Sequence, residues 1–343
     1  MGCKRRRPHD YSSTEIPEFF WEPGIVGGYR EPGISVKESL VSIFELHNET
    51  LNIWTHLGAL AFFLGYMCST SSSLNLYSDV TLRPLLFMFL SSCLYSTTSV
   101  LAHTFNSMNE LSQHVGFMID YYGICVYAFV TAISNLSYAF PDSWRSTRVE
   151  QSFIVASFLS TLLAISLACK SRFPKFGLVC KLMRLLPFVL SYVISMSPLL
   201  YRVTMEYDAK DGTVHYYRHF IDAVFTFGFY SSHFPELAFP GYFNVYFHSH
   251  QIFHVFVALG TYFKLRGLMA DYESGHTFIE IPNCTLLVSL AALTKALVTL
   301  YYIWTMRSVK KGKQSSLDHH HGYCNGNGNA HDSMAYNGVK KVN

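Results

Sequence analysis

A few side chains that can bind metal or transfer protons lie far apart in a largely apolar sequence, yet they are expected at the same depth of a membrane. The set comprises His103, Asp120, His250 and His254, with Ser99 one helical turn before His103. Three imidazoles leave one position of a zinc ion open, which is typical of catalytic rather than structural zinc. Ionisable groups inside membrane helices are costly and usually face a protein interior. The set therefore predicts a zinc site within a membrane protein.

The spacing of the set predicts a role for each member. His250 and His254 are four residues apart, so they share a helix face and can bind one ion together. His103 completes a three-histidine set. Asp120 is expected to orient water at the open position, either as a ligand or from the outer shell. Ser99 is expected to contact that water or a substrate.

Two structural alternatives stay open for these residues. A polar side chain near a helix end can reach the membrane interface or bond a neighbouring carbonyl group. A zinc ion that only bridges helices would also stabilise the bundle by itself. His248 points away from His250 on a helix and is expected to be structural.

Composition indicates a membrane protein. Of the 343 residues, 50% are hydrophobic and 14% are charged, whereas an average soluble domain has about 25% charged residues. The eight cysteines form no CxxC motif, so neither a disulfide framework nor a zinc ribbon is indicated. The sequence contains no nucleic-acid-binding feature.

Eight apolar runs are long enough to span a membrane. They are 51–70, 84–103, 115–135, 152–169, 182–201, 220–238, 246–265 and 284–306. The expected fold is all-α, a polytopic membrane helical bundle with a seven-helix core plus an eighth C-terminal transmembrane helix. Residues 1–50 are expected to form a cytoplasmic segment, 51–306 the transmembrane domain, and 307–343 a disordered cytoplasmic tail.

Basic residues predict the orientation of the bundle. Lysines and arginines cluster at the N-terminus, in the loop after the fourth run and in the tail, which eight spans would bring to one side. Such clusters mark the cytoplasmic side, so both termini are expected to be cytoplasmic. All members of the metal-binding set then lie at the inner leaflet, and this common depth supports a single site.

Three shorter signals concern membrane attachment and location. Residues 35–48 could form an amphipathic helix on the cytoplasmic face, or a capping element packed on the bundle. Cys3 is a candidate for palmitoylation beside a basic run that can bind anionic lipid. The C-terminal KKVN resembles a dilysine retrieval signal. The expected location is therefore the plasma membrane, with retrieval to the endoplasmic reticulum.

The chain resembles the progestin and adipoQ receptor family. The segments that carry this resemblance are NETLNIWTHL (48–57), SVLAHTFNSMNELSQHVGFMIDYYGI (99–124), PELAFPGYFN (235–244) and HSHQIFHVFVALGTYF (248–263). Within the family, FHSHQIFH, FFWEPGIVGGYREP and the eighth run resemble the membrane progestin receptors, the gamma type among them, more than the adiponectin receptors. The resemblance implies zinc bound by the three histidines, with Asp120 acting through water. It also implies a steroid ligand and hydrolytic activity on ceramide-like amides.

Two classes of function are consistent with these observations. The first is a receptor whose helical bundle binds a progestin-like steroid or other lipid and signals to a cytoplasmic protein such as a G protein. The second is a zinc-dependent, ceramidase-like lipid-amide hydrolase, in which Asp120 moves the proton and Ser99 positions the carbonyl group. The two are compatible if the ligand regulates hydrolysis. A rhodopsin-like receptor is disfavoured because the third run lacks E/DRY, and a metalloprotease because HExxH is absent.

Overall fold

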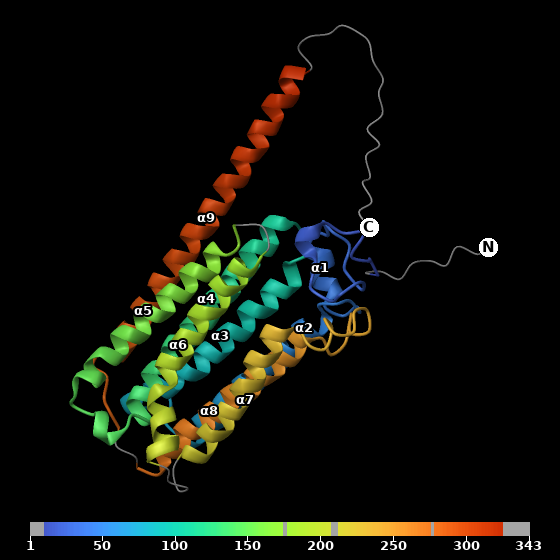
Figure 1. The fold of residues 1–343 in the computed structure, drawn as a ribbon. Helices are drawn as coiled ribbons and strands as arrows, with labels where there is room; N and C mark the ends of the chain where they lie inside the picture. Colours follow the sequence, from blue (N-terminus) through green and yellow to red (C-terminus); the bar gives the residue numbers. More distant parts are fainter. Residues whose placement is uncertain (1–9, 174–176, 207–211, 276–277, 325–343) are drawn as a thin grey trace. The chain divides into compact units, whose positions relative to one another are not determined.

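The computed structural model describes the chain except residues 1–9, 174–176, 207–211, 276–277 and 325–343, and the side chains of 313–324 (Figure 1). Its regular structure there is helical, apart from one isolated β-bridge between Tyr11 and Tyr29. The helices are α1 (Val36–Ser42), α2 (Thr50–Ser73), α3 (Arg83–Phe105), α4 (Glu110–Tyr138), α5 (Arg148–Lys170), α6 (Leu178–Met205), α7 (Thr213–Ser232), α8 (Ser249–Glu273) and α9 (Cys284–Cys324). Short 3-10 turns lie at Glu18–Phe20, Val80–Leu82 and Asp142–Trp144. The predicted all-α, polytopic membrane fold is confirmed.

Over the described residues, seven helices are long and apolar enough to cross a membrane, namely α2, α3, α4, α5, α6, α8 and α9. α7 is absent from this group because charged and imidazole side chains interrupt its apolar sequence. It nevertheless runs antiparallel along α8. At one end the backbone N–H of Gly212 donates to Asp271 at 2.8 Å, and at the other the rings of Tyr230 and Phe253 are 5.2 Å apart. α7 therefore extends through the same height of the bundle as α8.

The predicted bounds of the sixth and seventh runs, 220–238 and 246–265, are wrong. α7 ends at Ser232 because His233 adopts a left-handed conformation, with φ 51°, and Pro235 cannot continue a helix. The polar first turns of α7 are helical although they do not read as a membrane span. α8 begins after His248 and continues to Glu273, because the polar residues of its last turns are buried in the bundle.

The C-terminal part of the chain differs from the predicted span. The chain divides into two compact units, Met1–Ile303 and Trp304–Asn343. α9 continues to Cys324, past the predicted end at 306, because extending an existing helix costs far less than starting one. The first part of the predicted disordered tail is therefore helical. Residues 325–343, with the KKVN ending, lie outside the described residues, as do Cys3 and the basic run beside it.

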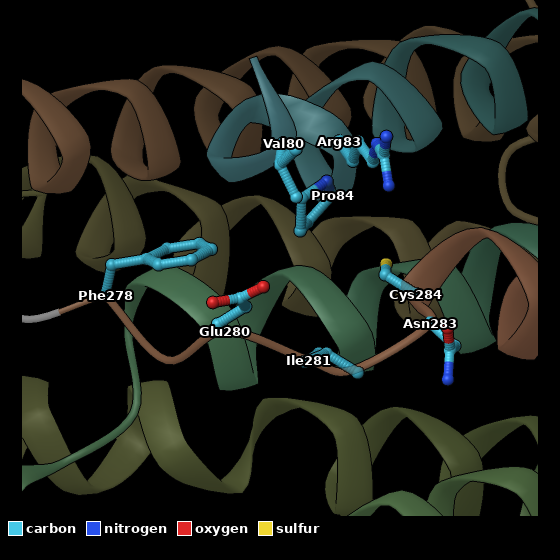
Figure 2. Close-up of a pocket in the computed structure, with 8 residues that line it drawn as sticks. All are labelled: Val80, Arg83, Pro84, Phe278, Glu280, Ile281, Asn283 and Cys284. Atoms are coloured by element: carbon cyan, nitrogen blue, oxygen red, sulfur yellow. The ribbon is translucent and has the colours of Figure 1, made fainter.

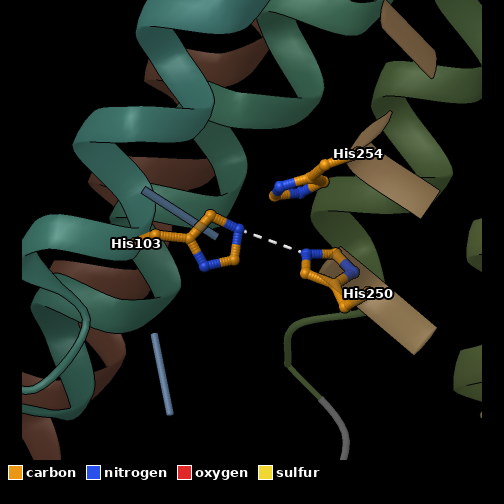
Figure 3. Close-up of side chains that lie close together, drawn as sticks. All are labelled: His103, His250 and His254. Atoms are coloured by element: carbon orange, nitrogen blue, oxygen red, sulfur yellow. Dashed lines mark hydrogen bonds between the residues drawn. The ribbon is translucent and has the colours of Figure 1, made fainter. Parts of the chain in front are cut away.

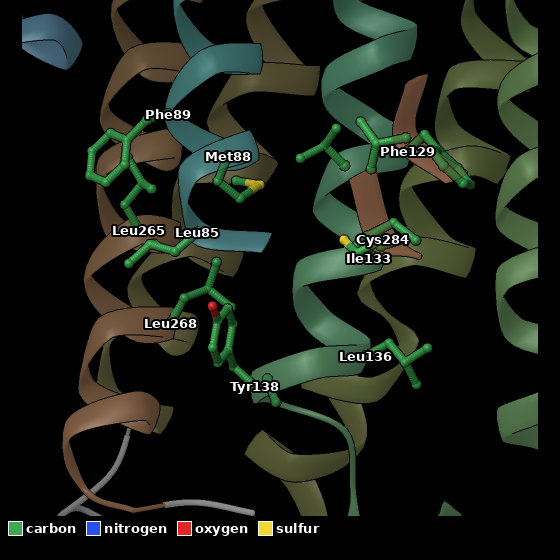
Figure 4. Packing of buried hydrophobic residues seen from close by; sticks show 14 of the residues in the cluster. Leu85, Met88, Phe89, Phe129, Ile133, Leu136, Tyr138, Leu265, Leu268 and Cys284 are labelled. Carbon is green, nitrogen blue, oxygen red and sulfur yellow. The ribbon is translucent and has the colours of Figure 1, made fainter. Parts of the chain in front are cut away.

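The core of the first unit is formed by apolar side chains of α2 to α9, most of them from α3 and α4 (Figure 4). Two glycines let α4 approach α3 closely. A Cβ at Gly116 would lie 3.2 Å from the Cα of Ala102, and one at Gly123 would lie 3.0 Å from the Cα of Tyr95. Asp120 lies four residues after the first glycine and three before the second. This spacing places it on the face of α4 that packs against α3.

The short helix α1 buries two of its serines and exposes its apolar side chains. Its start is fixed by a capping box between Ser35 and Glu38. Ser39 and Ser42 are buried against the rest of the protein. The exposed apolar residues of α1 and the turn after it are Val36, Leu40, Val41, Phe44 and Leu46. This inverted pattern favours the membrane-surface alternative for residues 35–48 over a capping element packed on the bundle.

Candidate metal centre

Three histidines from two helices converge near one end of the bundle (Figure 3). His103 lies in the last turns of α3, and His250 and His254 lie in the first turns of α8. One ring nitrogen of each lies within 4.8 Å of the others. The Nε2 atoms of His103 and His250 are 3.2 Å apart. Zinc–nitrogen bonds of about 2.0–2.1 Å in a tetrahedron place ligand nitrogens roughly 3.3–3.4 Å apart, so this pair fits one edge of a zinc site.

The start of α8 is fixed by the segment that precedes it. Glu236 is buried and accepts hydrogen bonds from the backbone N–H of Ser249, at 2.7 Å, and from its hydroxyl group. The Nε2 atom of His248 lies 3.1 Å from the backbone oxygen of Asn48. His248 therefore has a structural contact and lies outside the three-histidine group, as predicted. These bonds set the position at which His250 enters the bundle.

The end of α3 is fixed by Arg30, which lies in the N-terminal segment and is buried. Its guanidinium donates to the backbone oxygens of His103 and Thr104 at 2.6 and 2.8 Å. It also donates to the side-chain oxygens of Ser42 and Asn106, at 3.0 and 2.5 Å. Burial lowers the pKa of Arg30 to about 10, so the group remains charged at neutral pH. A cation at this position satisfies the free carbonyls of the helix end and favours its dipole.

Glu49 orients His103 and is a site residue that the sequence analysis missed. The carboxylate accepts from Nδ1 of His103 at 2.7 Å, from Asn52 at 2.6 Å and from Asn106 at 2.8 Å. Burial by itself would raise the pKa of Glu49, but the interaction with His103 and the hydrogen bond from Asn52 hold it well below its usual value. With the proton on Nδ1, the Nε2 lone pair of His103 faces the other two histidines. Carboxylates hold metal-binding histidines in this way.

α2 supplies two further contacts to the histidine group. The hydroxyl group of Thr55 lies 3.1 Å from Nδ1 of His254, and the ring of His56 packs at 3.9 Å from that of His254. The sequence analysis assigned no role to His56. The available signal was the spacing of Glu49, Asn52 and His56, which are three and four residues apart and so share one face of α2.

Asp120 and Ser99 lie beside the three histidines rather than among them. Asp120 is not a member of the group defined by ligand distances, although it is close enough to interact electrostatically with His103. This position agrees with action through water rather than as a direct ligand. Ser99 is 3% exposed, and its hydroxyl group has no hydrogen-bond partner in the structure. A buried hydroxyl group without a partner, one turn from His103, is consistent with a site that binds water or a substrate there.

Glu22 of the N-terminal segment adds a second carboxylate near this end of the bundle. Its side chain is exposed to solvent, which screens the charges around it. Desolvation and the nearby charge of Glu49 raise its pKa to about 7, against the opposing effect of His103. The group therefore titrates near neutral pH.

A separate small pocket lies at the opposite end of α3 from His103 (Figure 2). Its lining comes from the start of α3 and from the segment before α9, and includes Arg83, Phe278 and Glu280. None of the predicted site residues lines it.

Comparison with known proteins assigns the chain to a family. Residues 44–265 match the model of the family described as haemolysin-III related. The chain is 33% identical over 328 residues to membrane progestin receptor gamma-A of Danio rerio, which covers 87% of this chain and 94% of that protein. It is 34% identical to human membrane progestin receptor gamma, over 77% of this chain and 82% of that protein. It is also 34% identical to human membrane progestin receptor delta, over 77% of this chain and 79% of that protein. The predicted resemblance is confirmed, and the chain belongs to the haemolysin-III-related family of multi-pass membrane proteins, in which its relatives are the membrane progestin receptors.

Proposed function

We propose that this protein is a membrane receptor for a progestin-like steroid, with a zinc site formed by His103, His250 and His254. The observation that carries the proposal is its similarity, over 87% of the chain, to a protein named as a membrane progestin receptor. The histidines lie at the ends of α3 and α8, so a lipid that enters between these helices would reach them. Apolar sites between helices suit ligands of this kind.

The histidine group supports zinc as the metal. Its ligands are nitrogens only, two of the rings are buried, and Glu49 fixes the orientation of His103. Zinc bound there would join α3 to α8 and, as a Lewis acid, would polarise a carbonyl group of the ligand. Thr55 would hold the ring of His254 through its Nδ1 atom.

The proposed orientation places the histidine end of the bundle at the cytoplasmic face. Basic residues gather at that end. Arg172 donates to His114 at 3.2 Å, and the ammonium group of Lys181 donates to the last turn of α7 at 2.8 Å. This bias favours a cytoplasmic position for both termini. A cytoplasmic signalling protein such as a G protein would then contact this end, with the receptor in the plasma membrane.

Binding and metal content test the receptor proposal together. Detergent-purified protein should bind tritiated progesterone saturably and contain about one zinc per chain by elemental mass spectrometry. The double variant His250→Ala/His254→Ala should lose the zinc. His215→Ala, which removes an imidazole near the opposite end of the bundle, should keep both properties. Absence of binding across steroid classes would reject the receptor, and folded wild type without zinc would reject the metal site.

A lipid-amide hydrolase is the second candidate, and the partnerless hydroxyl group of buried Ser99 favours it. In this role Ser99 donates a hydrogen bond to the oxygen of the substrate carbonyl as negative charge develops there. Asp120 accepts a proton from the attacking water and passes it to the leaving amine. We expect His250→Ala to abolish turnover of a ceramide substrate. Turnover that survives complete removal of zinc would exclude this mechanism.

A further inference from the structure

A second polar group lies deeper in the bundle than the histidines and is centred on Asp222 of α7. Asp222 is 4% exposed, and its Oδ1 atom has no hydrogen-bond partner in the structure. Its other oxygen has only a long contact of 3.5 Å with the hydroxyl group of Thr226. No cation pairs with Asp222 among the described side chains. A carboxyl group left this way inside a membrane bundle is costly and marks a function.

The surroundings of Asp222 are polar, yet their hydrogen bonds are directed elsewhere. The hydroxyls of Tyr127 and Tyr192 are near enough to interact electrostatically with Asp222. Tyr127 bonds instead to Thr261 at 3.1 Å, and Tyr192 lies 3.3 Å from Nε2 of His219. Three other helices, α4, α6 and α8, therefore contribute polar groups near Asp222 while leaving Oδ1 available.

The position of Asp222 relates it to the histidine group. A Cβ at Gly260 of α8 would collide with the carboxyl of Asp222, so the two helices touch at this level. Gly260 is six residues beyond His254, which corresponds to about 9 Å along a helix. The fused rings of a steroid can bridge such a distance. One ligand could therefore reach the histidine group with one end and Asp222 with the other.

We propose that Asp222 accepts a hydrogen bond from a hydroxyl group of the bound lipid, so that the site prefers a hydroxysteroid to the corresponding ketone. This inference rests on the proposed steroid-binding function and specifies the ligand's polar group. A ketone offers no hydrogen to Oδ1 and leaves it unpaired, whereas a hydroxyl satisfies it. Sites built to bond a hydroxyl discriminate strongly against analogues that lack it.

The test compares progesterone, a diketone, with its singly reduced 3-hydroxy and 20-hydroxy forms on full-length protein in detergent. Wild type should bind one hydroxy form at least about tenfold more tightly than the diketone, because the diketone leaves the buried Oδ1 atom without a partner. Asp222→Leu, which keeps the branched outline, should abolish the preference. Ser231→Ala, which removes a hydroxyl bonded to the backbone of its own helix near the end of α7, should retain it. A preference unchanged in Asp222→Leu, or absent in a wild type that does bind steroid, overturns the proposal.

Thermal stability without ligand separates this inference from the receptor proposal. Replacing a partnerless buried carboxyl with an apolar group should leave the melting temperature of Asp222→Leu equal to wild type or higher. If wild type binds no steroid at all, the receptor proposal fails and stability alone decides. A lower melting temperature in Asp222→Leu then assigns a structural role and rejects the binding site, while an equal or higher one retains it for a different hydroxylated lipid.

Discussion

Replacing Glu49 with glutamine should weaken zinc binding without removing any proposed ligand. Glutamine keeps the size of the side chain but loses the negative charge that His103 contacts at 2.7 Å. Nδ1–H of His103 would then face a neutral acceptor, and Nε2 would become a weaker ligand. Loss of such an orienting carboxylate reduces metal affinity by about 10- to 100-fold, which corresponds to roughly 1.4–2.8 kcal/mol.

The structure also predicts an effect of this substitution on stability. Both oxygens of Glu49 accept hydrogen bonds, one from Asn106 and the other from Asn52 and His103. A glutamine amide has a single oxygen, so its NH₂ group must face one of these donors. At least one buried hydrogen bond is lost, the one from Asn106 in one orientation of the amide and those from Asn52 and His103 in the other, at a cost of about 1–3 kcal/mol for each donor left unpaired. The metal-free variant should therefore melt at a lower temperature than wild type.

A chelator competition on folded, purified protein measures the zinc affinity directly. Glu31→Gln removes an exposed carboxylate from the same N-terminal segment and should leave the affinity unchanged. His103→Ala gives the value expected when a ligand is lost. Zinc affinity of Glu49→Gln within twofold of wild type, with a clear loss in His103→Ala, would refute the orienting role of Glu49.

Two further predictions concern stability. Arg202 pairs with Asp271 at 2.7 Å with both side chains buried, so Arg202→Met should destabilise the protein by about 3–5 kcal/mol. Arg202→Met/Asp271→Asn removes the unpaired charge and keeps an oxygen that can accept from Gly212, so it should recover part of this loss in a thermal unfolding assay. A double variant as unstable as the single one would contradict the reasoning. The pKa of Glu22 is raised from 4.5 to about 7 in the folded protein. As pH rises, the Glu22 carboxyl therefore loses its proton in the unfolded state before it does so in the folded state. The free energy of unfolding of metal-free wild type should fall as pH rises from 4.5 to about 7. Glu22→Gln should flatten this fall, and equal pH profiles of the two proteins would show that Glu22 does not titrate as described.

The sequence predicts the three histidines well because their signal is local and repeated. His250 and His254 have the spacing of two ligands on one helix, and apolar runs around all three histidines set their depth. Glu49 could not be found in this way. It lies just before an apolar run, where an acidic residue reads as an ordinary helix-start residue. The spacing of Glu49, Asn52 and His56 marks one polar face of α2, but it does not show that this face packs against α3 and His103.

The contribution of Arg30 escapes sequence reasoning for a related reason. Arginine in a Pro- and Gly-containing segment reads as a solvent-exposed charge, and the residue is separated by over seventy positions from the carbonyls that it binds. Only the folded N-terminal segment brings the guanidinium to the end of α3. Seven of the eight predicted runs correspond to helices that are long and apolar enough to span a membrane, because burial in lipid requires every span to be helical.

The errors in the bounds of α7 and the burial pattern of α8 have one physical cause. Along α8, polar residues recur at intervals of four, seven, three and seven residues, which keeps them on one face. They are His250, His254, Thr261, Lys264 and Asp271, and the last four are buried. Val255 and Leu259 on other faces are exposed. α8 therefore has the lowest hydropathy of the seven candidate spans, although Val255 and Leu259 present an apolar surface outward.

The same inversion explains why α7 does not meet the criterion for a span while it lies along α8. Its buried polar side chains, His219 and Asp222, face the helices that it packs against, so they lower the hydropathy of the sequence without exposing polar groups to lipid. Hydropathy is thus weakest in the two helices that carry most of the polar groups inside the bundle. In a protein of this kind, the helices that score lowest as membrane spans are those where ligand and metal contacts should be sought first.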